Sequence, residues 1–367
     1  MIALKKEFNS PDRICLYKIN DMVSNKFNFN NKNNSILIIE PFLFHNECTP
    51  GFSKYFTDLG YNVDIIMSKI GISSLCLFEP INKIRLFIYG KNEEIIKNID
   101  YFNLILKKYS YILIETAEPK MSHLYTKLNL LNNNNSIFVF HHIDYSYSLP
   151  FANKLKNTQI WTLGNFSNGT QVIPHYFGDI KKKRKNKKTK FFITSTINRK
   201  YNLLVSSAKK IKKENLKFHI MVVGRTGNFS KTNIPEDLKD NFSFKYRISY
   251  KELYKIVYNS DYIIINLDPN NAADVNFQKI RVSGSSQLVY GFLKPVLINE
   301  EFARFYNFNS SNSLIYDNSN FSKVMKDAIN LHNKEYKKLQ ENLSLLSNEI
   351  YSRSLSKVKN CLKELMK

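Results

Sequence analysis

Short apolar runs alternate with longer amphipathic stretches along most of the chain, and this alternation constrains the fold more than any other feature. Runs such as SILIIE at 35–40 and DYIIINLD at 261–268 are apolar on both faces of a strand. Strands of this kind are typical of parallel sheets covered by crossover helices, whereas half-exposed strands alternate polar and apolar residues. The sequence therefore predicts an α/β fold with parallel sheets.

The predicted elements form two series of similar size, with no detectable sequence repeat. The first has strands at 35–40, 62–67, 84–89, 111–115, 136–140, 159–163 and 170–173, with helices at 51–59 and 93–108. The second has strands at 190–194, 218–224, 242–247, 261–268 and 295–298, with helices at 202–213, 249–259, 283–292 and 321–366. A length of 367 residues also fits about two domains. We therefore expect two Rossmann-like, doubly wound domains that face a cleft.

The formal net charge of +23, from 54 Lys and Arg against 31 Asp and Glu, indicates an anionic partner. Nucleic acid, a phosphorylated small molecule and an acidic membrane surface all fit. The basic run at 181–190 is interpreted as a solvated linker or as a lysine patch that faces anionic lipid. No helix-turn-helix, zinc-binding or RRM pattern supports nucleic acid. The sequence also lacks an apolar stretch long enough for a signal peptide or a membrane span, and its four cysteines lie far apart, so we expect a reduced, cytoplasmic chain without structural zinc.

The strongest local motif is a small-residue turn at the start of a predicted helix. Its sequence is RVSGSSQ at 281–287. Small residues let an anion approach the backbone, and the free amides of a helix start favour negative charge. Serine hydroxyls and an arginine add donors, although an ordinary serine N-cap would give the same pattern. The predicted phosphate-binding residues here are Arg281, Ser283, Gly284, Ser285 and Ser286.

Two cations follow the first strand of the second series, Arg199 and Lys200. In a parallel sheet their loop opens at the same edge as the serine turn, so we expect both to help neutralise a diphosphate. Gly224 and Arg225 close the next strand at that edge, and Arg247 follows the one after. These three residues are candidates for contacts to a nucleotide base or a sugar.

The second half of the chain resembles the C-terminal nucleotide-binding domain of GT-B glycosyltransferases over about 190–316. The resemblance rests on a strand, basic loop and helix at 191–213, a strand that ends in Val-Gly at 224, a capped helix and strand at 249–267, and GFLKPV at 291–296. In this family a segment that ends in a similar Pro-Val turn presents backbone amides to the donor diphosphate. Counting back from Pro295, these would be the amides of Gly284 and Ser285. The first half resembles the family in architecture only.

The chain departs from the family pattern at one point. Retaining members often carry two glutamates eight positions apart in this segment, and the second one binds the donor ribose. Ile280 and Leu288 occupy these places. The resemblance therefore leaves the ribose contact and the stereochemical outcome unassigned.

Two loops of the first half are where the resemblance places catalytic and sugar-binding residues. The loop after 35–40 holds Asn46 and Glu47, as a sugar contact and a general base, and HHID at 141–144 follows another strand. An imidazole titrates near neutrality, which suits proton transfer, and a histidine at the end of a comparable strand often contacts the reaction centre in GT-B enzymes. The predicted catalytic residues are Glu47, His141 and His142, and His175 is a further candidate for a sugar contact.

The resemblance implies a metal-independent glycosyltransferase, since cations and helix amides do the work of a metal, and no Asp-x-Asp triplet occurs. Its donor is a nucleotide sugar, with UDP favoured, and its acceptor is a glycan or lipid-linked sugar of a bacterial surface polysaccharide, capsule or lipopolysaccharide pathway. We expect it on the inner face of the plasma membrane, with no cofactor besides the donor. Implied domains are an extension (1–34), an acceptor domain (35–178), a linker (179–189), a donor domain (190–330) and a C-terminal helix (331–367) packed back on the acceptor domain. Alternatives are a nucleic-acid-binding protein, or a GT-B-like epimerase or non-glycosyl transferase.

Overall fold

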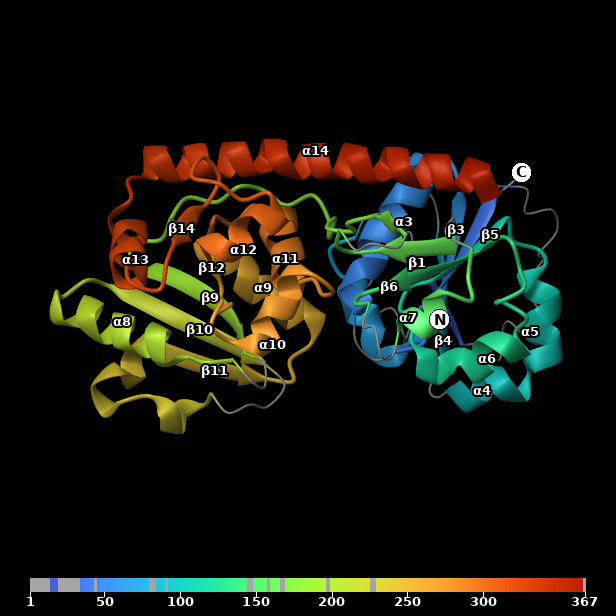
Figure 1. The fold of residues 1–367 in the computed structure, drawn as a ribbon, viewed down its shortest axis with the longest axis horizontal. Coiled ribbons are helices and arrows are strands. Elements are labelled where there is room, and N and C mark those ends of the chain that lie inside the picture. Colours follow the sequence, from blue (N-terminus) through green and yellow to red (C-terminus); the bar gives the residue numbers. More distant parts are fainter. Residues whose placement is uncertain are drawn as a thin grey trace. The chain divides into compact units, whose positions relative to one another are not determined.

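The computed structural model divides the chain into two compact units, drawn in Figure 1. Unit 1 comprises Met1–Asp179 with Tyr351–Lys367, and unit 2 comprises Ile180–Ile350. The structure describes residues 14–18, 34–42, 45–78, 84–89, 92–143, 148–156, 159–165, 169–195, 199–224 and 229–365.

Unit 1 contains a parallel sheet with the strand order β1-β4-β3-β2-β5-β6-β7-β8. Its strands are β1 (Ile14–Lys18), β2 (Ser35–Ile39), β3 (Asn62–Ser68), β4 (Ile84–Tyr89), β5 (Tyr111–Ile114), β6 (Ser136–Phe140), β7 (Ile160–Thr162) and β8 (Thr170–Gln171). Its helices are η1 (Asn46–Cys48), α3 (Thr49–Asp58), η2 (Lys69–Leu75), α4 (Asn92–Lys97), α5 (Ile99–Leu106), η3 (Pro119–Met121), α6 (Ser122–Lys127) and α7 (Leu149–Ala152). The residues of β2, β5 and β6 are all buried, as their apolar sequences predict.

Two details of unit 1 differ from the sequence-based expectations. Ile14–Lys18, assigned to an N-terminal extension, forms the edge strand β1 beside β4. The helix expected over 93–108 is interrupted at Asn98, where the side-chain amide donates a hydrogen bond to the carbonyl of Glu94 at 2.9 Å. Asparagine side chains compete in this way with the backbone hydrogen bonds of a helix, which explains the break.

Unit 2 contains a parallel sheet with the strand order β11-β10-β9-β12-β13-β14. Its strands are β9 (Thr189–Ser195), β10 (Phe218–Gly224), β11 (Phe242–Tyr246), β12 (Tyr262–Ile265), β13 (Val296–Asn299) and β14 (Leu314–Tyr316). Its helices are α8 (Asn202–Lys213), η5 (Lys231–Asn233), η6 (Glu236–Asn241), α9 (Tyr250–Asn259), α10 (Ala272–Val275), η7 (Asn276–Gln278), α11 (Gly284–Phe292), α12 (Glu300–Ala303), η8 (Arg304–Tyr306) and α13 (Phe321–Asn330). Apolar residues of α8 and α13 share one core with β9, β10 and β12.

The strand order reverses at one point in each sheet, which locates the expected ligand crevice. In unit 2 the chain starts at β9, proceeds outward to β11, and returns to place β12 on the other side of β9. In unit 1 the same reversal separates β2 from β5. Loops at the carboxyl ends of the two strands diverge at such a reversal, and ligands of doubly wound sheets bind there.

The basic run at 181–190, expected as a solvated linker, is partly anchored to unit 2. Lys183 Nζ donates a hydrogen bond to Asn259 Oδ1 at 3.0 Å, and Lys185 Nζ donates to the carbonyl of Leu331 at 3.0 Å. Thr189 and Lys190 begin β9. The second half of the run is therefore part of the domain, while six of its cations remain exposed: Lys181, Lys182, Arg184, Lys187, Lys188 and Lys190.

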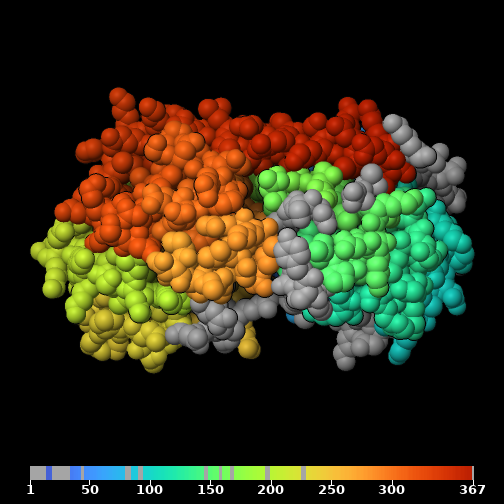
Figure 2. Space-filling view, in the orientation of Figure 1, coloured from blue at the N-terminus to red at the C-terminus, as the bar shows by residue number. Residues whose placement is uncertain are grey.

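The C-terminal segment forms α13 and a separate 33-residue helix, α14 (Asn333–Leu365), rather than the single helix expected. Leu331 leaves the helical conformation between them, with a φ of −58° and a ψ of 127°, and its carbonyl accepts a hydrogen bond from Lys185 Nζ. Residues of α14 up to Ile350 belong to unit 2 and those from Tyr351 onward belong to unit 1. Figure 2 shows its outer side as a red strip of surface. No helix in the described part of the chain is both long and apolar enough to cross a membrane.

Candidate active site

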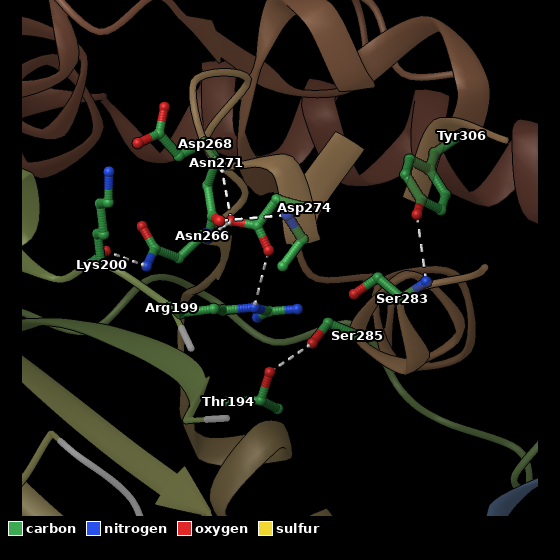
Figure 3. Close-up of polar contacts among 11 residues, drawn as sticks. Thr194, Arg199, Lys200, Asn266, Asp268, Asn271, Asp274, Ser283, Ser285 and Tyr306 are labelled. Carbon is green, nitrogen blue, oxygen red and sulfur yellow. Dashed lines mark hydrogen bonds and ion pairs between the residues drawn. The ribbon is translucent and has the colours of Figure 1, made fainter. Parts of the chain in front are cut away.

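The reversal point of unit 2 gathers polar side chains from three segments of the chain, and Figure 3 shows them. Thr194 lies near the end of β9, and Arg199 follows it. Asn266 and Asp274 come from the segment after β12, and Ser285 lies in the first turn of α11. Thr194 and Ser285 are 91 positions apart in the sequence, and they meet because crossover connections return the chain to the same end of the parallel sheet.

Arg199 is the central cation of this cluster. Its side chain is 5% exposed and its Nε lies 4.0 Å from Asp274 Oδ1. The guanidinium also lies over the ring of Phe277, 5.6 Å from the ring centroid. Figure 3 shows it between the Asp274 carboxylate on one side and Thr194 and Ser285 on the other. Its Nε and Nη1 are buried and have no hydrogen-bond partner among the described residues, so the site contains unused, positively charged donors.

Asp274 balances part of the charge of Arg199. Its carboxylate accepts hydrogen bonds from the amide of Asp268 and from Asn271 Nδ2, both at 3.1 Å. Burial raises the pKa of Asp274, and the Arg199 charge opposes that rise. These two donors fix the Asp274 carboxylate beside the Arg199 guanidinium. The Nε and Nη1 donors of Arg199 remain available to a ligand.

The first turn of α11 adjoins Arg199 and carries the predicted serine motif. Ser285 Oγ and Thr194 Oγ1 form a hydrogen bond of 3.0 Å, which ties α11 to β9. Ser286 Oγ donates to the carbonyl of Ser283 at 2.7 Å, so its proton is committed within the turn. The amide of Ser283 donates to Tyr306 Oη at 3.1 Å, and its hydroxyl makes no N-cap hydrogen bond. The ordinary serine N-cap is therefore absent, while Gly284 is exposed at the helix start.

The other residues of unit 2 that the sequence predicts as ligand contacts are mostly exposed. Lys200 is exposed, and its carbonyl accepts a hydrogen bond from Asn266 Nδ2 at 2.9 Å. Arg281 is exposed, and its amide donates to the carbonyl of Asn276 at 3.0 Å. Gly224 ends β10 and its carbonyl accepts from the amide of Arg247, which is exposed with a φ of 52°. Arg225 lies outside the described residues.

A surface cavity of about 470 Å³ opens beside Arg199 and Lys200. Its wall continues along the start of α8 and includes Tyr201, whose ring stacks on Phe229 with centroids 4.0 Å apart. A cavity of this size is in the range of small-molecule sites.

The reversal point of unit 1 holds two fully buried carboxyl groups. Glu40 follows β2 and Glu115 follows β5, next to the register pair Ile39 and Ile114. Thr116 Oγ1 donates to Glu40 Oε2 and Thr49 Oγ1 donates to Glu115 Oε2, each at 2.6 Å. Burial raises the pKa of both carboxyls well above the usual range, and the two charges repel each other.

A pair of stacked histidines lies beside these carboxyls. The rings of His45 and His141 have centroids 4.0 Å apart, and His45 Nδ1 lies 3.6 Å from Glu47 Oε1. The backbone of His45 has a φ of 74°, an uncommon conformation for a non-glycine residue. Burial, followed by the neighbouring His45, holds the pKa of His141 well below its usual value. The structure thus brings together the predicted Glu47 and His141.

The remaining predicted residues of unit 1 are placed less favourably for a direct contact with a ligand. The Asn46 side chain is fully buried, and a Cβ at Gly71 would lie 2.1 Å from its Oδ1, so a sugar contact is not open to it in this structure. His175 is 3% exposed, and its Nδ1 lies 3.0 Å from the carbonyl of Ile173. His142 is partly exposed next to His141.

Sequence reasoning missed Glu40, Glu115, Thr116 and Asp274. A signal was present for the two glutamates, since each is a carboxylate that directly ends an apolar strand. Asp274 follows β12 by nine positions, and its partnership with Arg199 depends on the path of that loop. Among the described residues, no group of three or more His, Cys, Asp or Glu side chains is arranged to hold a metal ion.

The overall fold is similar to several solved structures. A glycosyltransferase from Rickettsia africae matches with a TM-score of 0.56 and 15% identity over 92% of this chain and 99% of that one. A TarM variant from S. aureus in complex with fondaparinux, alpha-GlcNAc-glycerol and UDP matches with a TM-score of 0.54 and 10% identity over 90% and 99%. A putative UDP-N-acetylglucosamine 2-epimerase from Listeria monocytogenes matches with a TM-score of 0.51 and 10% identity over 90% and 97%.

No protein-family model matches the sequence, and no curated protein matches it either. The structural similarity, at these identities, concerns the fold. The chain has the GT-B fold, with two Rossmann-like α/β units, as the resemblance in sequence implied.

Proposed function

We propose that the chain is a glycosyltransferase that uses a nucleotide-sugar donor, with UDP as the favoured nucleotide. The observation that carries this proposal is the buried Arg199 guanidinium, whose Nε and Nη1 lack partners among the described residues beside the first turn of α11. A diphosphate satisfies such donors and gains from the helix amides, whereas a neutral ligand leaves the charge uncompensated. The UDP in the similar TarM complex supports the choice of nucleotide.

In this proposal the unit 2 site stabilises the leaving group. As the bond from the anomeric carbon to the diphosphate breaks, the electron pair stays on the diphosphate and its negative charge increases. Arg199, the amides of Gly284 and Ser285, and the exposed Lys200 and Arg281 are the groups that offset this charge. Preorganised donors of this kind give the largest single contribution to transition-state stabilisation in many enzymes.

The unit 1 site supplies the base in this proposal. His141 is neutral at pH 7, because its pKa is lowered, and it can take the proton from the acceptor hydroxyl while the oxygen bonds to the anomeric carbon. His45, Glu47 and His142 surround the same imidazole. The acceptor in this proposal is a glycan or lipid-linked sugar of a surface polysaccharide or lipopolysaccharide. The cationic side chains of the donor site offset the diphosphate charge, so the proposed reaction uses no metal ion. The partly buried basic run and the exposed lysines of α14 would hold the enzyme at the inner face of the plasma membrane.

Calorimetric titration with a panel of nucleoside diphosphates, with and without Mg²⁺, tests the donor site. We expect UDP to bind and the Arg199→Gln variant to bind it at least about tenfold more weakly, because a charge-assisted hydrogen bond is lost. Arg304→Gln is the matched control, since Arg304 is exposed and lies over the ring of Phe305. Absence of binding by every nucleoside diphosphate would sink the proposal. Incubation with nucleotide sugars then separates transfer, which releases the nucleoside diphosphate, from epimerisation, which retains it.

A further inference from the structure

The two buried glutamates of unit 1 occupy equivalent positions, each directly after a strand, but their hydrogen bonds differ. Both side chains are fully buried at the ends of the neighbouring strands β2 and β5. Glu40 accepts one donor on each oxygen, the Phe42 amide at 2.7 Å on Oε1 and the Thr116 hydroxyl at 2.6 Å on Oε2. Glu115 accepts the Thr49 hydroxyl on Oε2, while its buried Oε1 has no partner among the described residues.

This difference assigns the charge within the pair. Two carboxylates this deeply buried and mutually repelling do not both ionise near neutral pH. Glu40 has donors at both oxygens, which suits the acceptor-only carboxylate, and Glu115 has a free oxygen to carry a proton. The hydrogen bonds therefore favour the charge on Glu40 and the proton on Glu115.

A short hydrogen-bond chain connects Glu40 to His141. Thr116 uses its single hydroxyl proton for Glu40, so it faces His141 Nε2, 3.4 Å away, as an acceptor. The carbonyl of Glu115, 3.0 Å from the same nitrogen, is also an acceptor. Two acceptors at Nε2 require the proton to be on Nε2, and the lone pair is then on Nδ1.

We propose that Glu40 is a positioning residue for His141: its carboxylate holds the Thr116 hydroxyl as a second acceptor beside the Glu115 carbonyl, and the two acceptors together keep the imidazole in the Nε2–H tautomer, with Nδ1 as the proton acceptor. The catalytic consequence rests on the proposed role of His141 in glycosyl transfer, whereas the tautomer itself does not. When Nδ1 takes a proton from a hydroxyl, the O–H bond breaks, an N–H bond forms, and the Glu40 carboxylate offsets the charge of the imidazolium.

The groups around His141 come from several elements. His45 and Glu47 face it from η1 and its N-cap, Glu115 from the end of β5, and His142 from the end of β6. Thr116 also faces it, and in the described part of the chain its hydroxyl and the carbonyl of Glu115 are the groups within hydrogen-bond distance of Nε2.

The test is a nitrogen-detected NMR measurement of the histidine rings in the full chain, which distinguishes protonated from unprotonated ring nitrogens. The chain has seven histidines, and loss of one set of signals in His141→Gln assigns His141. We expect the Nε2–H tautomer in the wild type. In Glu40→Gln, the amide NH₂ can donate to Thr116 and free the threonine proton for His141 Nε2, so the Nδ1–H tautomer should appear as a measurable fraction.

A double variant and a matched control sharpen this test. Because the amide acts only through Thr116, the pair Glu40→Gln with Thr116→Val should return to the Nε2–H tautomer. Thr49→Val is the control: it removes a buried hydroxyl with the same 2.6 Å bond to a glutamate side chain, but this hydroxyl is not part of the Glu40–Thr116–His141 chain, and Glu115 contacts His141 only through its backbone carbonyl. Its His141 signals should match the wild type. Fluorescence of Trp161, the chain's single tryptophan and a buried residue of unit 1, reports whether each variant folds.

Activity gives the second readout. If the chain transfers sugar as proposed, Glu40→Gln should lower kcat by about tenfold or more, with KM for the nucleotide sugar unchanged within about twofold, because the wrong tautomer blocks proton transfer but not binding. An Nδ1–H tautomer in the wild type overturns the inference, even if Glu40→Gln does not fold. So does a Glu40→Gln spectrum identical to the wild type. A chain with the expected tautomers but no transfer activity contradicts the proposed function alone.

Discussion

At the scale of single residues, Lys294 is a buried lysine whose charged form is disfavoured by burial. It is 1% exposed between α11 and β13, and its Nζ donates to the carbonyl of Tyr258 at 2.8 Å. Burial lowers the pKa of Lys294 from 10.5 to about 8, and the neighbouring Asp261 only partly opposes this shift. The protonated form is therefore less favourable in the folded chain than in the unfolded chain.

This shift predicts the sign of a pH dependence. Between about pH 8 and 10.5 the unfolded chain binds more protons at this group than the folded chain, so its contribution to the free energy of unfolding rises with pH there. The full change is of the order of 3 kcal/mol. Urea unfolding of the wild type and Lys294→Met, followed by far-UV circular dichroism from pH 7 to 10, should show a difference that moves in favour of the wild type. A difference that stays constant across this range would contradict the lowered pKa.

Residue identity alone predicted part of the candidate site. Arg199 and the serine turn were found from their types and their positions after predicted strands, and the structure places Arg199 beside Ser285. Asp274 and Thr194 were not found, because their contacts depend on how loops fold back. The burial of Asn46 also followed no local signal, since it results from the approach of η2 at Gly71.

At the scale of elements, α9 shows how local sequence sets a helix boundary. The predicted N-cap is confirmed, since Ser249 Oγ accepts a hydrogen bond from the Glu252 amide at 3.2 Å. The Glu252 side chain forms an ion pair with Lys245 at 3.1 Å. The cap was predictable because its partners lie three residues apart. The ion pair was not, because it joins α9 to β11 and depends on how these two elements pack.

Helix α3 depends on a glycine for its packing. A Cβ at Gly51 would lie 2.6 Å from the carbonyl carbon of Pro174, which is part of the backbone and cannot rotate away. Replacement of glycine by alanine at an exposed helix position raises the free energy of unfolding by about 1 kcal/mol. At Gly51 we expect the opposite, a decrease of about 1–3 kcal/mol for unit 1. Urea unfolding followed by Trp161 fluorescence measures this change.

Gly60→Ala separates the steric effect from the conformational one. Gly60 has a φ of 85°, and no atom of the described residues lies within 4 Å of an added Cβ, so this substitution should cost only the strain of the left-handed conformation, about 1–2 kcal/mol. A Gly51→Ala variant that is more stable than the wild type would show that α3 and Pro174 can separate at no cost.

At the scale of the whole molecule, the net charge of +23 has three contributions. Arg199 lies in the candidate donor site, Lys183 and Lys185 are bonded to unit 2, and most other cations are exposed. The exposed members of the basic run at 181–190 are the part available to an extended anionic surface.

Vesicle binding tests this last contribution. We expect the chain to sediment with vesicles that contain phosphatidylserine but not with neutral phosphatidylcholine vesicles, and to dissociate as salt increases. Replacing Lys181, Lys182, Lys187 and Lys188 by glutamine should weaken binding by up to about 1 kcal/mol per lysine. The four exposed lysines Lys209, Lys210, Lys213 and Lys217 provide a control set of equal charge. Equal losses from both sets would indicate a diffuse charge effect and contradict a role for the run.

The sequence by itself determined the α/β class, the two series of strands and most helix positions, because these depend on periodicity and on contacts a few residues apart. It also indicated the GT-B fold through the order of elements in the second half. The tertiary structure decided which residues meet at each sheet reversal. Glu40 and Glu115 are 75 positions apart and lie side by side only because β5 returns next to β2. Such contacts arise from strand order and loop paths, which no local pattern encodes.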